Sequence, residues 1–127
     1  MIWIDSSFAV EWLLGTDKAK RIKLPQEALG ILPQQYAETF VFFLRRGLDP
    51  TAIANELESL ELMAPEKTHL QLGAQLYAKA RLSNKSKASL ADAVLAAVVL
   101  VNGEKLLAFD RDFSELGLHE KNALWQG

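Results

Sequence analysis

The chain contains no cysteine and only two histidines among its 127 residues. The lack of cysteine excludes disulfide bonds, thiolate zinc sites and cysteine nucleophiles, and it gives no sign of an oxidising compartment. A bound metal ion must therefore be held by oxygen atoms or by histidine. His69 and His119 do not have the spacing of a ligand pair, so we expect structural or surface roles for both.

Long apolar runs are also missing. The longest run, residues 93–101, is far shorter than the ~20 residues of a membrane-spanning helix. The first residues lack the basic region and apolar stretch of a secretory signal. We therefore expect a cytoplasmic protein without a membrane span. With half of its residues hydrophobic, the chain has the size and apolar content of one domain over residues 1–127.

Neither sign of charge predominates, since 14 Lys and Arg stand against 16 Asp and Glu and give a net charge of −2. This balance argues against a protein that binds nucleic acid over its whole surface. The basic residues are nonetheless clustered, although a single cluster is more often the solvated face of a helix than a binding site. These clusters are Lys18, Lys20, Arg21 and Lys23; Arg45 and Arg46; and Lys79, Arg81, Lys85 and Lys87.

Short apolar runs alternate with helical patterns along the chain. We predict strands at residues 1–4, 28–32, 60–62 and 105–109, and helices near 7–14, 33–46, 50–57, 70–80 and 90–101. Two of the helices begin with proline, and Gly15 and Gly103 follow two others. The alternation predicts an α/β fold in three layers, α/β/α, with a mainly parallel central sheet.

Four acidic residues each end or interrupt an apolar segment. Asp5 and Asp110 follow the first and last predicted strands, Asp92 lies at the start of a helix, and Glu38 lies among aromatic and aliphatic residues. The aspartates can be explained as helix caps, and Ser89 to Asp92 has the spacing of a capping box. Glu38 is harder to explain in this way, because an unpartnered charge in apolar surroundings is costly.

The four acids are more informative together than singly. The carboxyl ends of parallel strands and the first turns of the following helices meet at one edge of the sheet. Carboxylates that converge there repel one another, and a divalent cation relieves this repulsion. Oxygen ligands favour Mg²⁺ or Mn²⁺, ions that keep several waters and contact phosphate oxygens. The sequence therefore predicts a metal site that hydrolyses a phosphate ester.

The segments around these acids, in their order along the chain, resemble the motifs of the PIN-domain ribonucleases. The segments are Ile2-Trp3-Ile4-Asp5-Ser6-Ser7, Tyr36-Ala37-Glu38, Leu90-Ala91-Asp92-Ala93 and Leu106-Leu107-Ala108-Phe109-Asp110-Arg111-Asp112-Phe113. The resemblance spans nearly the whole chain and is greatest to the VapC-type toxins of toxin–antitoxin pairs. It implies a PIN fold and a metal-dependent endoribonuclease, which would leave a 5′-phosphate and a 3′-hydroxyl.

The resemblance also implies roles for individual residues. Asp5, Glu38, Asp92 and Asp110 would be the catalytic acids that bind Mg²⁺ or Mn²⁺. Asp112 is a candidate fifth ligand, although a cap or an ion pair with Arg111 explains it equally well. Ser6 would place a hydroxyl near the metal. Ala108 departs from the family, which commonly has threonine or serine at this position, so one orienting hydrogen bond is lost.

Further expectations concern partners. Arg45, Arg46, Lys85 and Lys87 are candidates for binding RNA phosphates that flank the scissile bond. The resemblance implies a homodimer and a cognate antitoxin protein.

Two alternatives remain open at this stage. One is a non-catalytic interaction module with a PIN fold. The other is an aspartyl-phosphate domain of the receiver or phosphatase kind, which is disfavoured because Ser7 stands where such a phosphatase has a second aspartate.

Overall fold

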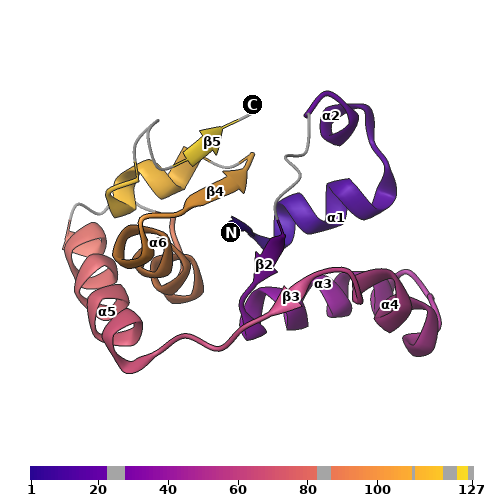
Figure 1. Ribbon diagram of the computed structural model, residues 1–127, viewed down its shortest axis with the longest axis horizontal. Coiled ribbons are helices and arrows are strands. Elements are labelled where there is room, and N and C mark those ends of the chain that lie inside the picture. Colours follow the sequence, from indigo (N-terminus) through magenta and orange to yellow (C-terminus); the bar gives the residue numbers. More distant parts are fainter. Residues whose placement is uncertain (23–27, 83–86, 110, 119–122, 126–127) are drawn as a thin grey trace.

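A computed structural model describes residues 1–22, 28–82, 87–109, 111–118 and 123–125 (Figure 1). In this part of the chain, a five-stranded sheet has the strand order β3-β2-β1-β4-β5. Every neighbouring pair is parallel, which agrees with the mainly parallel sheet predicted from the sequence. The strands are β1 (Ile2–Ile4), β2 (Leu29–Ile31), β3 (Glu61–Leu62), β4 (Lys105–Ala108) and β5 (Ala123–Trp125).

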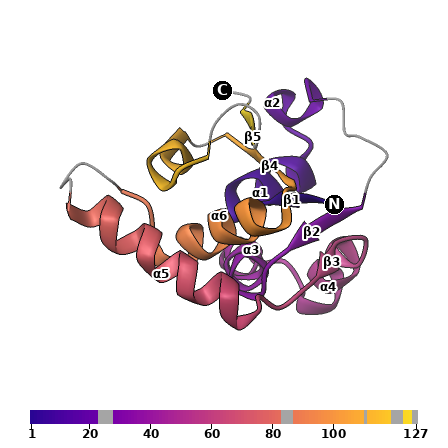
Figure 2. The same ribbon diagram turned by 60° about the vertical axis from the view of Figure 1, so that its left-hand side comes forward.

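Helices cover both faces of the sheet. The α-helices are α1 (Ser6–Leu14), α2 (Asp17–Lys20), α3 (Pro33–Arg45), α4 (Pro50–Leu57), α5 (Lys67–Leu82) and α6 (Leu90–Asn102), and a 3₁₀ helix, η1, spans Arg111–Leu116. Helices α5 and α6 lie side by side on one face, whereas α1, α3 and α4 lie on the other (Figures 1 and 2). The three-layer α/β/α prediction is therefore confirmed.

The alternation of side chains along the strands explains these layers. Ile2 and Ile4 of β1 pack into an apolar cluster with Phe8 of α1 and Phe43 of α3. Trp3, between them, points into the opposite cluster, which α6 and η1 complete. Because successive side chains of a strand point to opposite faces, a short apolar run buried on both faces fits a central strand.

Strand β5 was not predicted from the sequence. Ala123–Trp125 is only three residues long and has no alternating pattern, so periodicity alone cannot distinguish it from a loop. It becomes a strand by pairing with β4, where Leu124 lies opposite Leu107. The remaining strands were all predicted, with bounds that differ by one or two residues. No helix within the described residues is long and apolar enough to cross a membrane.

A polar contact joins α5 to α6 at the ends of both helices. His69 is buried, its Nδ1 accepts a hydrogen bond from the backbone N–H of Glu66 at 2.9 Å, and its Nε2 lies 3.0 Å from Oδ1 of Asn102. Because the Asn102 oxygen can only accept, the imidazole carries its proton on Nε2. His69 thus caps the start of α5 and ties it to the end of α6, a structural role.

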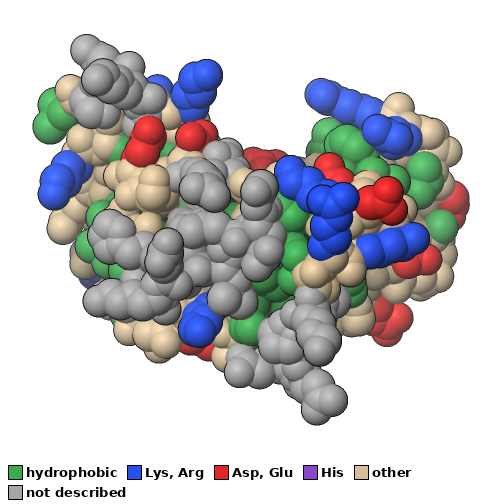
Figure 3. Space-filling model, turned by 90° about the horizontal axis from the view of Figure 1, so that it is seen from above, with side chains coloured by type: hydrophobic (Ala, Val, Ile, Leu, Met, Phe, Trp, Pro, Cys, Tyr) green, Lys and Arg blue, Asp and Glu red, His purple; other side chains and the backbone are tan. Residues whose placement is uncertain are grey.

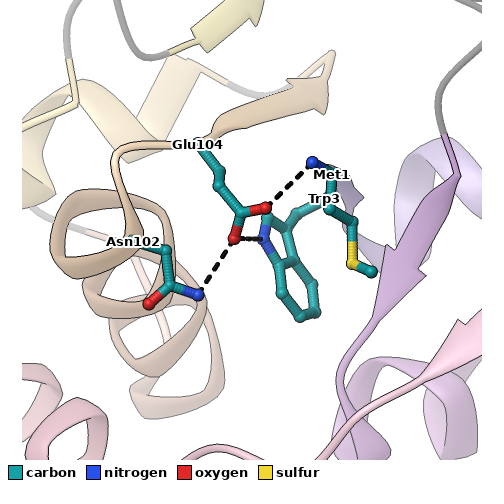
Figure 4. Close-up of polar contacts among 4 residues, drawn as sticks. All are labelled: Met1, Trp3, Asn102 and Glu104. Atoms are coloured by element: carbon teal, nitrogen blue, oxygen red, sulfur yellow. Dashed lines mark hydrogen bonds and ion pairs between the residues drawn. The ribbon is translucent and has the colours of Figure 1, made fainter.

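The amino ends of β1 and β4 are joined by Glu104 (Figure 4). Its carboxylate accepts hydrogen bonds from Trp3 Nε1 at 3.1 Å and Asn102 Nδ2 at 2.9 Å, and it pairs with the Met1 ammonium at 2.9 Å. Burial acts to raise the pKa of Glu104, but these three donors outweigh it and leave the pKa below its usual value. Met1, Trp3, Asn102 and Glu104 are called the amino-end cluster below.

Candidate functional site

The candidate site begins where β1 ends, at Asp5. Oδ1 of Asp5 accepts a hydrogen bond from the backbone N–H of Phe8 at 2.8 Å, and Oδ2 accepts one from the Ser7 hydroxyl at 2.8 Å. Asp5 is therefore the N-cap of α1, which is one of the two roles that the sequence suggested for it. Only 5% of its surface is exposed, so a carboxylate is held at the carboxyl edge of the sheet with little freedom to move.

The next residue, Ser6, connects this turn to α3. Its backbone N–H donates to Oε1 of Gln35 at 2.7 Å, and its hydroxyl donates to Oε2 of Glu38 at 3.0 Å. Gln35 and Glu38 are three residues apart, so they lie on the same face of α3. Glu38 is exposed rather than enclosed by its aromatic neighbours, and this removes the cost that a buried charge would carry.

Asp92 approaches from the first turn of α6. It forms the predicted capping box, in which its backbone N–H donates to the Ser89 hydroxyl at 3.1 Å and Oδ2 accepts from the Ser89 N–H at 3.3 Å. The second oxygen, Oδ1, accepts from Nε2 of Gln35 at 3.4 Å. Three of the four predicted segments, those of Asp5, Glu38 and Asp92, therefore meet around Ser6 and Gln35.

Other predicted residues are not brought into this arrangement by the described structure. Asp110 and Lys85 lie outside the described residues. Asp112 is half-buried on η1, and Lys87 is exposed before α6. Ala108 stands where the family commonly has a threonine or serine hydroxyl. Its side chain packs into the apolar cluster of α6 and η1. Within the described residues, no three acidic or histidine side chains lie close enough to hold a metal ion.

The donor chemistry nevertheless fits a hard divalent cation. Mg²⁺ is usually held by one or two carboxylates, and water and substrate phosphate complete its coordination. Asp5 and Asp92 supply two carboxylates that are linked through Ser6 and Gln35, and Glu38 adjoins them through the Ser6 hydroxyl. Within the described residues, Glu38 and Asp92 form no ion pair with a lysine or arginine, and their hydrogen-bond donors are uncharged.

A groove leads from the site along α3. A cavity of about 290 Å³ is lined by Ser6, Glu38 and Phe42, and a second, of about 770 Å³, shares Glu38 and Phe42 and continues to Arg45 and Arg46. We call the two together the α3 groove. The Arg46 guanidinium lies over the Phe42 ring, 4.6 Å from its centroid. Seen from above, the molecular outline is hollowed, with basic side chains to either side (Figure 3).

Gln35 was not predicted from the sequence. This side chain is only 1% exposed, although its neighbour Gln34 lies at the surface. The one signal for it is the spacing of three residues to Glu38, which places both on the same helix face. Nothing in the residue types distinguishes a buried glutamine from a surface glutamine.

The fold and these acids define a class of proteins, the parallel α/β domains that carry an acidic site at the carboxyl edge of the sheet. The sequence profile described as the PIN domain matches residues 2–118, and the chain therefore belongs to the PIN domain family. No curated protein matched the chain in a sequence search.

Solved structures with the same fold include three of nearly equal length. A toxin–antitoxin complex from Klebsiella pneumoniae is similar with a TM-score of 0.75 and 13% identity, over 100% of this chain and 98% of that one. VapC20 of Mycobacterium tuberculosis, a toxin that cleaves the sarcin–ricin loop, is similar with a TM-score of 0.68 and 22% identity, over 94% of this chain and 98% of that one. PAE2754 of Pyrobaculum aerophilum is similar with a TM-score of 0.68 and 18% identity, over 97% of this chain and 87% of that one.

Proposed function

We propose that this PIN domain is an endoribonuclease that depends on Mg²⁺ or Mn²⁺ and hydrolyses phosphodiester bonds of RNA. The observation that supports this most strongly is the pair of hydrogen bonds from Ser6 to Gln35 and Glu38, together with the bond from Gln35 to Asp92. These contacts bring acids from three distant segments to one edge of the sheet. In addition, the family provides the expectation of nuclease chemistry.

In this proposal, Asp5, Glu38, Asp92 and Asp110 hold the metal ion, and Asp112 is a candidate fifth ligand. A bound divalent ion lowers the pKa of a coordinated water and polarises a phosphate. Asp5 is rigid because both of its oxygens accept hydrogen bonds within the first turn of α1. Glu38 is exposed and therefore open to solvent, so it is the acid best placed to accept a proton from water. The Ser6 hydroxyl orients Glu38.

The RNA backbone would lie in the α3 groove. The groove runs from Ser6 and Glu38 to Arg45 and Arg46, so phosphates flanking the scissile bond would meet positive charge along one path. Lys85 and Lys87 are proposed to contact phosphates farther away. If Arg45 and Arg46 bind phosphates, replacing both with alanine should raise the KM for RNA and reduce its dependence on salt concentration, with kcat unchanged.

The biological setting is part of the same proposal. We infer that residues 1–127 form one domain that acts in the cytoplasm as the toxin of a toxin–antitoxin pair. The similarity to a structure from a toxin–antitoxin complex supports an antitoxin partner. The exposed apolar residues Val41 and Leu44 on α3 are compatible with a second copy or an antitoxin covering this helix. Light scattering of the isolated chain would reveal a homodimer.

The decisive experiment is cleavage of a panel of structured RNAs by the purified protein, free of any partner. Cleavage should require Mn²⁺ or Mg²⁺, stop with EDTA, and be lost in Asp5→Asn and Asp92→Asn. Cleavage that survives chelation or both substitutions would reject a metal-centred nuclease. A complete lack of cleavage by wild-type protein that still binds a partner would favour the non-catalytic interaction module. A stable aspartyl-phosphate after incubation with acetyl phosphate would favour the receiver or phosphatase alternative.

A further inference from the structure

The Gln35 side chain forms hydrogen bonds to both the β1–α1 turn and α6. Its Oε1 accepts from the Ser6 backbone N–H at 2.7 Å, and its Nε2 donates to Asp92 Oδ1 at 3.4 Å. The backbone N–H can only donate, so it fixes which end of the amide faces Ser6. The NH₂ group must then face Asp92, whose carboxylate can only accept when ionised. The amide therefore has one orientation that satisfies both neighbours.

The surroundings of Gln35 do not otherwise require a polar residue. The side chain is 99% shielded from solvent, and an apolar residue of similar volume would avoid the cost of burying an amide. Its two hydrogen bonds compensate this cost only while both Ser6 and Asp92 stay in place. A buried glutamine at this position thus specifies the relative placement of the two segments that it bridges.

We propose that Gln35 is a positioning residue, which sets the separation between Asp5 and Asp92 and so prepares the site for a divalent cation. The inference rests on the proposed function. Gln35 holds the Ser6 backbone, adjacent to Asp5, with its carbonyl oxygen. It holds Asp92 with its amide nitrogen, on the oxygen that the capping box leaves available. Without the amide, both carboxylates remain, but their spacing is no longer fixed.

The test replaces Gln35 with methionine, which has a similar volume and no hydrogen-bonding amide. The matched control is Gln75→Met on the exposed side of α5, which makes the same chemical change away from the site. Mn²⁺ affinity is measured by titration calorimetry, cleavage by kcat and KM, and folding by the unfolding midpoint without metal. Gln35→Met should weaken Mn²⁺ binding and lower kcat by about 10–100-fold, with KM for RNA unchanged, as for other outer contacts of metal ligands.

A second variant guards against misfolding of the first. Gln35→Glu keeps an acceptor for the Ser6 N–H but removes the donor to Asp92 and places a like charge beside it, so kcat should fall in a folded protein. The proposal is overturned if folded Gln35→Met has wild-type Mn²⁺ affinity and kcat, or if Gln75→Met shows the same losses; the nuclease proposal would survive either result. If wild-type protein binds Mn²⁺ but cleaves no RNA, weaker Mn²⁺ binding by Gln35→Met supports positioning and rejects the nuclease.

Discussion

The two ends of the central strands both carry acids, and the acids have different partners. At the amino ends, Glu104 is paired with an ammonium group and also accepts hydrogen bonds from an indole and an amide. At the carboxyl ends, Glu38 accepts from a serine hydroxyl, and Asp92 accepts from a glutamine amide and a backbone N–H. At the amino ends, the negative charge of Glu104 is therefore compensated by the Met1 ammonium. Among the described residues at the carboxyl ends, Glu38 and Asp92 accept hydrogen bonds from neutral donors only.

This difference separates a structural acid from a candidate functional acid. A carboxylate that already has a cationic partner stabilises the fold and has little to offer an incoming metal ion. A carboxylate held by neutral donors keeps its full charge and a fixed orientation, which are the properties that a divalent cation requires. The residue type is the same at both ends, so the partners decide the role.

The largest expected effect is on catalysis at the carboxyl end. Asp5→Asn and Asp92→Asn should each lower the rate of RNA cleavage on the order of 100-fold or more, because each removes a negative charge from the proposed metal site. Asparagine caps a helix about as well as aspartate, so α1 should keep its cap and the unfolding midpoint should change little. Cleavage assays at saturating Mn²⁺ and thermal unfolding measure the two effects separately.

The matched control for these variants is Glu104→Gln at the amino end. It should leave the cleavage rate unchanged, because the polar partners of Glu104 among the described residues all belong to the amino-end cluster. A large loss of activity in this variant would contradict the assignment of separate roles to the two ends.

The next largest effect is on stability at the amino end. Glu104→Ala should lower the free energy of unfolding by about 1–3 kcal/mol, because it leaves the partly buried Trp3 indole N–H without its acceptor and the ammonium without its partner. Urea unfolding followed by tryptophan fluorescence measures this. A free energy equal to that of the wild type would mean that water replaces the carboxylate without cost.

His69→Ala should have a somewhat smaller effect on stability, about 1–2 kcal/mol, because it removes the cap of α5 and the contact with Asn102. The loss should appear as earlier hydrogen exchange in the first turn of α5, residues 67–70. Unchanged exchange in that turn, measured by mass spectrometry, would show that His69 is not needed to hold the start of the helix.

The smallest effect concerns pH. The folded-state pKa of Glu104 lies below its unfolded value, so the unfolded state binds more protons and stability rises with pH. The contribution is complete above the ordinary carboxyl pKa near 4.5 and is lost as the pH falls through the lower folded-state pKa. The difference in unfolding free energy between wild type and Glu104→Gln should therefore be constant from about pH 5.5 to neutral pH and shrink below pH 4.5. A difference that is independent of pH down to pH 3 would contradict the lowered pKa.

The sequence was informative about the fold because its signals are local. Ile2–Ile4 and Lys105–Ala108 are short apolar runs, and the capping box from Ser89 to Asp92 marks the start of α6 three residues before a buried stretch. Strand β5 escaped prediction because its strand character depends on the neighbouring β4 rather than on its own three residues. The start of α5 depends on His69, which completes the cap only with Asn102 on another helix.

The candidate site was predictable in its acids but not in the contacts that join them. Asp5, Glu38 and Asp92 could be chosen because each breaks an apolar pattern, and the order of their motifs resembles a known family. Gln35 could not be chosen, because glutamine is ordinary at a helix surface and its burial is decided by how α3 packs against α1 and α6. A charged residue in an apolar segment can be recognised from the sequence alone. A glutamine that bridges two segments can be recognised only when the positions of both of its partners are known.

By itself, the sequence determined the order of β1 to β4 and of the longer helices α1, α3, α4, α5 and α6, the parallel α/β layers and the choice of candidate acids, because periodicity, caps and charge act over a few neighbouring residues. Only the tertiary structure decided which acid is paired and which is held by neutral donors. The reason is that Glu104 and Trp3 are 101 residues apart, and Gln35 and Asp92 are 57 residues apart. Contacts over such separations depend on how the layers pack, and they gave Glu104 a structural role and Gln35 its place between two acids.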